Sequence, residues 1–229
     1  MTRSAIIPRD FSDSNPQKIM FNNRSPFEEL APRGTAASFS GTKFLFKRKV
    51  LKLVGAAFSV TDQNDALVLY ADQKAFKLKE DIRVYTREDK ATEVLRIAAR
   101  SILDFSAAYD VFDSATNQKI GTLRRSGMKS MVRDEWQILD AQDREMGKIE
   151  EDSLVLALAR RFIDFVSLLV PQKYTITLGN QTVGQFAQTF NPFVMKIEAD
   201  FSADPTAILD RRLALAAGIL MCAIEGKQG

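Results

Sequence analysis

Histidine is absent from the 229 residues of this chain. Histidine is the usual general base near neutral pH and the commonest side-chain ligand of metal ions. Its absence excludes serine–histidine–aspartate triads, HExxH metalloproteases and zinc sites made of cysteine and histidine. P-loops, paired-glycine dinucleotide motifs and Gly-x-Ser-x-Gly elbows are missing as well. The sequence therefore predicts a non-enzymatic protein that carries no metal ion and no cofactor.

Cysteine and long apolar runs are equally scarce. The only cysteine, Cys222, excludes an intrachain disulfide and lies in an apolar stretch, where a buried and inert thiol is expected. The first residues, MTRSAIIPRDFSDSN, lack the apolar core of a secretory signal, and no later run qualifies as a transmembrane segment. These features predict a cytoplasmic protein without a transmembrane span, and leave a peripheral membrane location open.

Excess charge is also missing, because the formal net charge is only +3. A dedicated nucleic-acid binder would carry a larger basic excess, so we expect no nucleic-acid partner and only local basic sites. With 45% hydrophobic and 27% charged residues, the chain has the composition of a globular protein with one sizeable core.

Residues 1–41 show no sustained helical or strand period, and four prolines interrupt them. We expect a disordered or loosely attached N-terminal tail here, followed by a single domain over residues 42–229. Phenylalanines are spaced along the tail. Docking onto a protein partner through them is therefore an alternative role for the tail. The prolines are Pro8, Pro16, Pro26 and Pro32.

The domain begins with alternating residues typical of β-strands. In the run 44–50, FLFKRKV, Phe44 and Phe46 share one face while Lys47 and Lys49 share the other. Eleven further runs have strand character, which gives twelve in all. They lie at about 56–62, 66–72, 81–86, 93–99, 107–113, 118–125, 135–140, 145–150, 173–178, 181–189 and 193–200.

Several strands occur in similar pairs. The first member reads aromatic-x-aliphatic-x-Asp, where Asp is expected to end the strand by bonding the backbone of the turn. This pattern occurs at 58–62, 109–113 and 136–140. The returning strand carries a glycine, Gly121, Gly147 or Gly184, which indicates a kink or a close approach of another backbone. Repeated hairpins predict a closed antiparallel barrel, with unrelated bulges as the alternative.

The stretch 205–225 is predicted to be a helix, with Asp204 as its N-cap and Pro205 in its first turn. From Leu213 to Ile224 it is apolar on all sides, which requires burial. These 12 residues at about 1.5 Å each reach roughly 18 Å, well short of a hydrocarbon layer about 30 Å thick. We therefore expect a central helix enclosed by a barrel of twelve strands, because barrels of that size have room for one.

A second, amphipathic helix is predicted at about 153–169. Its apolar residues recur at helical spacing, with Arg160, Arg161 and Asp164 opposite them. Packing on the outside or over a mouth of the barrel is the simplest interpretation, and contact with a membrane surface is the alternative.

In four segments the chain resembles the LURP-one-related and phospholipid scramblase-like proteins, which are grouped with tubby. The segments are 58–74, 109–125, 136–152 and 210–225. The resemblance implies a twelve-stranded barrel around a central C-terminal helix. Its tubby-like branch implies phosphoinositide binding and its scramblase branch implies lipid movement with calcium, whereas the LURP-one branch implies no settled activity.

The chain departs from the scramblase-like pattern. Its tail has no cysteine for acylation, and Asp200, Asp204 and Asp210 lack the spacing and the glycine of an EF-hand loop. We therefore expect no calcium site there.

Two clusters of cations are candidates for binding an anionic lipid headgroup, because anionic surfaces attract such clusters and Arg and Lys donate well to phosphate. Ordinary solvated surface and protection of strand edges are the alternative roles. The candidate residues are Lys47, Arg48, Lys49 and Lys52 in the first cluster, and Arg124, Arg125, Lys129 and Arg133 in the second.

We therefore predict a non-enzymatic binding or scaffolding module that recognises an anionic membrane surface or a phosphoinositide. A scramblase-like lipid-handling protein and a protein–protein interaction module are the alternatives.

Overall fold

The computed structural model describes seven stretches of the chain, and all of them belong to one compact unit, Ala31–Gly229. These stretches are residues 36–51, 55–74, 81–100, 108–126, 135–152, 172–189 and 195–225.

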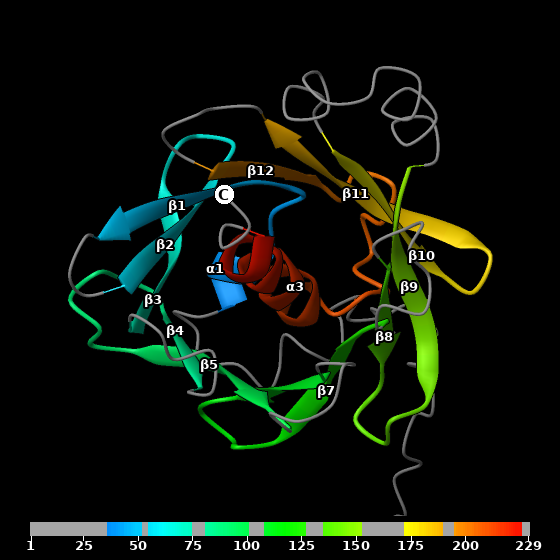
Figure 1. Ribbon diagram of the computed structural model, residues 1–229, viewed down its shortest axis with the longest axis horizontal. Coiled ribbons are helices and arrows are strands. Elements are labelled where there is room, and N and C mark those ends of the chain that lie inside the picture. The colour runs from blue at the N-terminus through cyan, green and yellow to red at the C-terminus, as the bar shows by residue number, and fades with distance from the viewer. Residues whose placement is uncertain are drawn as a thin grey trace, which may run out of the picture. The chain divides into compact units, whose positions relative to one another are not determined.

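Twelve antiparallel strands form a closed barrel, in which each strand pairs with its neighbours in sequence and β1 pairs with β12 to close the ring. Figure 1 shows this ring with helix α3 in its middle. The predicted fold class and all twelve predicted strands are confirmed. The strands are β1 (Lys43–Leu51), β2 (Gly55–Asp62), β3 (Leu67–Lys74), β4 (Ile82–Tyr85), β5 (Glu93–Ala99), β6 (Ala108–Asp113), β7 (Lys119–Arg125), β8 (Glu135–Leu139), β9 (Glu145–Glu151), β10 (Lys173–Leu178), β11 (Gln181–Thr189) and β12 (Met195–Asp200).

One end of the barrel, which we call the turn end, carries five hairpin turns of related design. The expectation that Asp ends the strand is confirmed: Asp62 Oδ1 accepts hydrogen bonds from the backbone of Asn64 and Ala66, and Asp113 and Asp140 do the same in their own turns. Each turn contains one residue with positive φ, which favours Asn, Asp and Gly. These residues are Asp65, Lys90, Asn117, Asp143 and Gly179.

The glycines of the returning strands lie where another backbone comes close, as expected from the sequence. A Cβ added at Gly121 would lie 2.5 Å from the carbonyl oxygen of Leu139 and 2.9 Å from Cδ2 of Leu213 in the helix. The hairpins also share a register shift next to the turn, as between Val111 and Phe112. The repeated motif therefore marks a repeated structural unit.

Helix α3 (Arg211–Glu225) begins six residues later than predicted. Its N-cap is Asp210, whose Oδ1 accepts from Arg212 N at 2.9 Å, while its carbonyl accepts the first helical hydrogen bond from Ala214 N at 3.0 Å. The prediction that Asp204 caps the helix and that Pro205 opens it was wrong. Asp210 offers the same capping chemistry, and the chain needs the intervening residues to cross the turn end.

Asp204 instead organises the loop 201–210. Its carboxylate accepts from Ile208 N at 2.8 Å and Leu209 N at 3.1 Å, and its carbonyl accepts from Arg211 at 2.8 Å. The guanidinium of Arg211 lies 4.4 Å from the centre of the Phe201 ring. Burial lowers the pKa of Arg211, while the charges of Asp204 and Asp210 act in the opposite direction.

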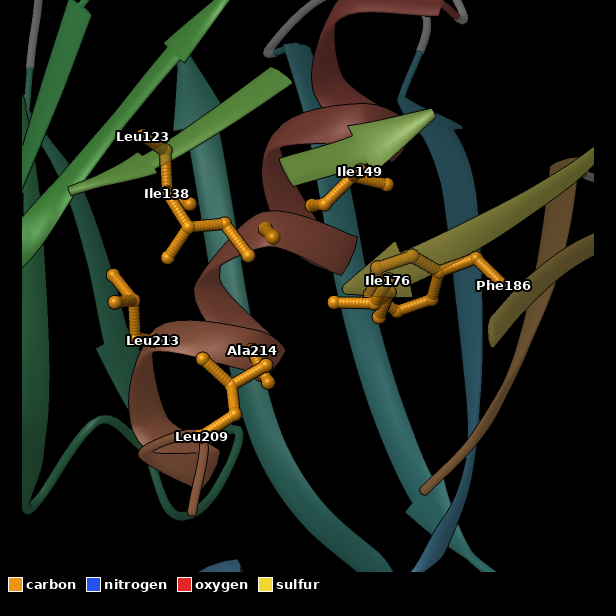
Figure 2. A pocket seen from close by; sticks show the side chains of 9 residues that line it. Leu123, Ile138, Ile149, Ile176, Phe186, Leu209, Leu213 and Ala214 are labelled. Carbon is orange, nitrogen blue, oxygen red and sulfur yellow. The ribbon is translucent and has the colours of Figure 1, made fainter. Parts of the chain in front are cut away.

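The core is the space between α3 and the strands. Residues 213–223 of the helix are all buried, Gly218 included, and Cys222 is buried as predicted. α3 packs mainly against β1 and β12, where Gly218 lies against the ring of Phe46. On the other side of the helix, strand residues reach toward it across a gap too narrow for a water molecule (Figure 2). The gap is lined by Leu123, Ile138, Ile149, Ile176, Phe186, Leu209, Leu213, Ala214 and Ala217.

A short helix, α1 (Ala36–Phe39), precedes β1, contacts β3 and packs Phe39 against the core. The predicted amphipathic helix at 153–169 lies outside the described residues. Within the described stretches, neither α1 nor α3 has the length and apolar character that crossing a membrane requires.

Candidate anion-binding surface

The first basic cluster divides between the two faces of β1. Lys47 and Lys49 point outward, and the side chain of Lys47 is 36% exposed. Arg48 shares the inner face with Phe46 and lies opposite the buried Phe58. Burial lowers the pKa of Arg48, while the neighbouring Cys222 acts to raise it. Arg48 is therefore not part of the same surface as the two lysines.

The closure of the barrel adds a lysine that the sequence analysis missed. Lys196 on β12 is the direct cross-strand partner of Lys47. Like charges placed directly opposite each other are destabilising in a sheet. No ion-pair partner of Lys196 or Lys49 occurs among the described residues, and Lys47 has only Asp65, at 3.7 Å.

The same cross-strand row continues over the outer face of the next strands. Lys47 pairs with Ser59 on β2, Ser59 with Tyr70 on β3, and Tyr70 with Tyr85 on β4. We call Lys196, Lys47, Ser59, Tyr70 and Tyr85 the lysine–tyrosine row. Because neighbouring strands lie about 4.8 Å apart, this row is roughly 20 Å long. It presents cations at one end, aromatic rings at the other and a hydroxyl between them.

The second basic cluster lies across the barrel from the first. In the sheet order, β7 is separated from β1 by five strands in either direction, and Figure 1 shows the two strands on opposite sides of α3. Arg124 is on the outer face of β7, whereas Arg125 is on the inner face, with its guanidinium 6.0 Å from the centre of the Trp136 ring. Lys52, Lys129 and Arg133 lie outside the described residues.

Two other outward cations, Arg100 and Lys119, belong to a closed network with Asp110 and Asp143. Arg100 donates to both carboxylate oxygens of Asp110, at 2.8 and 2.7 Å, and also binds Asp143. Lys119 lies 2.6 Å from Asp143, and Thr122 donates to Asp110 at 2.7 Å. Burial alone would raise the pKa of Asp110, but hydrogen bonds from Arg100, Thr122 and Lys119 outweigh it and lower the pKa. These cations are neutralised and offer little to a ligand.

Among the residues that the structure describes, no cluster of three or more Cys, Asp or Glu side chains is arranged to hold a metal ion.

Twelve antiparallel strands closed around a buried helix, α3, define the class of protein as a helix-filled β-barrel domain. The family model LURP-one-related matches residues 67–222, and the chain belongs to this family.

The chain is also similar to a solved structure of a protein from Arabidopsis thaliana, with 12% sequence identity and a TM-score of 0.45. The alignment covers 82% of this chain and 93% of the Arabidopsis protein. No curated protein sequence matches the chain.

Proposed function

We propose that this protein is a non-enzymatic binding module that recognises anionic phospholipid headgroups, phosphoinositides included, through the lysine–tyrosine row. The observation that carries the proposal is the direct cross-strand pairing of Lys47 with Lys196. Two cations held opposite each other repel, so a bound anion relieves a cost that the free protein bears. Phosphate groups carry the required charge and accept hydrogen bonds from lysine.

The remainder of the row suits a membrane surface. Tyr70 and Tyr85 are half-buried on the outer face, and tyrosine is enriched where a surface meets lipid headgroups. Lys49 adds an exposed cation two residues beyond Lys47 on the same strand. The row therefore combines electrostatic attraction with aromatic contact along one face of the barrel.

Sedimentation with liposomes tests the proposal. Binding to phosphatidylcholine vesicles that contain phosphatidylinositol 4,5-bisphosphate should exceed binding to phosphatidylcholine alone, and should weaken with added salt because surface charges are screened. Each lysine near an anionic surface contributes about 1 kcal/mol, so the double variant Lys47→Gln/Lys196→Gln should bind roughly 30-fold more weakly.

Lys148→Gln is the matched control. Its side chain is 41% exposed, close to that of Lys47, but it already forms an ion pair with Glu150 at 2.8 Å. Equal binding by the double variant and the parent protein would refute the proposal. Faster lipid flip-flop in reconstituted vesicles would instead favour a scramblase-like protein, and absence of lipid binding would favour a protein-interaction module.

A further inference from the structure

Three side chains form a cluster on the inner face of the barrel, away from the lysine–tyrosine row. They are Tyr109 on β6, Arg125 on β7 and Trp136 on β8, which we call the arginine–aromatic cluster. The ring centres of Tyr109 and Trp136 are 6.2 Å apart, and Arg125 lies over the Trp136 ring at 6.0 Å. Arg125 and Trp136 are direct cross-strand partners.

The cluster lies at the end of the barrel opposite the turn end. Arg125 is the last residue of β7, while Tyr109 and Trp136 are each the second residue of their strands. Deeper in the barrel, the same inner face continues with Leu123 and Ile138, which line the apolar gap beside α3 (Figure 2). The cluster therefore marks the change from an apolar interior to a polar rim.

Trp136 carries a buried hydrogen-bond donor for which the described part of the chain offers no acceptor. The residue is 2% exposed, and its Nε1 has no hydrogen-bond partner among the described residues. Indole N–H groups that are buried usually find an acceptor, since an unmet donor inside a protein is costly. Glu151, a buried carboxylate further along the inner face of β9, is not bonded to this nitrogen.

The other two members of the cluster are also donors. Arg125 has a permanent positive charge and a planar fork of N–H groups that matches a carboxylate or phosphate. The phenol of Tyr109 stays protonated, because burial raises its pKa although the charge of Arg125 acts to lower it. A guanidinium, an indole N–H and a phenol O–H thus belong to three side chains that lie next to one another at one part of the rim.

We propose that the arginine–aromatic cluster is a second ligand site, which binds an oxyanion group of a ligand, phosphate or carboxylate, at the rim of the barrel. Arg125 supplies the charge, Trp136 donates from Nε1, and Tyr109 donates from its hydroxyl. This site faces the interior between β6 and β8 and is separate from the outer lysine–tyrosine row. It does not depend on the function proposed for that row.

The only tryptophan of the chain reports on this site directly. We expect saturable changes in Trp136 fluorescence when the full-length protein is titrated with sodium phosphate or sodium acetate, with sodium chloride at matched ionic strength as the baseline. Vesicles of phosphatidylcholine with and without phosphatidic acid form the second arm. A response to the soluble anions identifies a free oxyanion as the ligand, and a response only to phosphatidic acid identifies a lipid headgroup.

Arg124 and Arg125 are adjacent in β7 and lie on opposite faces of the sheet. Substitutions at these two positions therefore form a matched pair of variants. Arg125→Gln should weaken the fluorescence response at least about tenfold, which is the loss expected for one charge-assisted hydrogen bond, whereas Arg124→Gln should leave it unchanged. If Arg125→Gln fails to fold, Arg125→Lys keeps the charge without the planar fork and should show a smaller loss. Tyr109→Phe should weaken the response without changing the fold.

Two results would overturn the assignment: no specific response to phosphate, acetate or phosphatidic acid, or a response that Arg125→Gln leaves intact. Lys47→Gln/Lys196→Gln should retain the full Trp136 response to the soluble anions, phosphate and acetate. Failure of the outer row to bind liposomes and failure of the inner cluster to respond are therefore separate outcomes.

Discussion

Arg212 in α3 donates a hydrogen bond from Nη1 to Oδ2 of Asp113 at 2.7 Å, across 99 positions of the chain. The other oxygen of Asp113 accepts from the backbone N–H groups of Ala115 and Thr116, at 2.9 Å each. One carboxylate thus shapes the β6–β7 turn and also fixes the start of the central helix. Nε and Nη2 of Arg212 donate to the carboxylate of Asp210, the N-cap, at 2.7 to 3.2 Å.

Removal of this link should loosen the helix inside the barrel. Both side chains are largely buried, so Arg212→Gln should lower the free energy of unfolding by about 2 kcal/mol, the typical value for a hydrogen bond between charged groups. Asp113→Asn retains Oδ1 for the turn, and a double-mutant cycle in urea should give a coupling energy of at least about 0.5 kcal/mol. Additive effects of the two substitutions would mean that the pair does not act as a unit.

The network of Arg100, Asp110, Lys119 and Asp143 should make the free energy of unfolding depend on pH in the acid range. Hydrogen bonds from Arg100 and Lys119 hold the pKa of Asp143 far below its usual range, and the pKa of Asp110 is also lowered. A carboxylate with a lowered folded pKa contributes stability that is fully present above its unfolded pKa, about 3.9, and is lost as the pH falls below that value.

Urea unfolding between pH 7 and pH 2 measures this effect. The loss of unfolding free energy below pH 4 should be smaller in Asp110→Asn than in the parent protein, because the variant has one fewer carboxylate to protonate. Glu198→Gln, an exposed carboxylate outside the network, is the control. Parallel pH profiles of the parent protein and Asp110→Asn would contradict the prediction.

Lys196→Glu should change the stability of the protein and its binding to anionic vesicles in opposite directions. The substitution converts the repulsive pair with Lys47 into an attractive one. The free energy of unfolding should therefore rise by about 0.2 to 1 kcal/mol. Binding to anionic vesicles should fall at the same time. Lys173→Glu makes the same change of charge on the outer face opposite Ala187, and should not stabilise the protein. A destabilised Lys196→Glu protein would argue against repulsion at this pair.

Gly218→Ala should destabilise the protein although alanine is the better helix former. Alanine in place of glycine favours a helix by about 1 kcal/mol, but the added Cβ would lie 2.6 Å from Cε1 of Phe46. Phe46 is buried and packs edge-on against Phe186, so a shift of its ring would disturb that contact, and overpacking typically costs about 1 to 3 kcal/mol. Thermal unfolding should therefore show a lower midpoint, and Phe46→Leu in the same chain should restore part of it.

The local parts of the fold could be predicted from the sequence because their signals are local. Alternation locates a strand, an aspartate at its end marks a turn, and a glycine such as Gly121 marks a close approach of backbones. The start of α3 could not be predicted in the same way. Asp204 and Asp210 have identical capping chemistry, and the choice between them depends on the length of chain needed to cross the turn end.

The candidate site depends on contacts between distant residues. Lys47 and Lys196 are 149 positions apart, and their pairing exists only because β1 closes against β12. The alternation of residues within β1 or within β12 does not predict which residue of the other strand lies opposite. Alternation along the strand does predict that Arg48 and Lys47 lie on opposite faces of the sheet. Only the burial of Phe46 and Phe58 shows that the face of Arg48 is the one toward the core. Binding of a headgroup by Lys47, Lys49, Arg124 and the other candidate cations stays a prediction.

The closure of β1 against β12 also sets the order of events during synthesis. The ribosome delivers the first eleven strands, with their inner faces of Val, Ile, Leu and Phe, before it delivers either the closing strand or the helix that covers those faces. The nascent chain therefore exposes a wide apolar surface until residues 211–225 leave the exit tunnel. Such surfaces aggregate readily, so production of the protein should respond strongly to chaperone supply and to slow translation of the codons for residues 195–225.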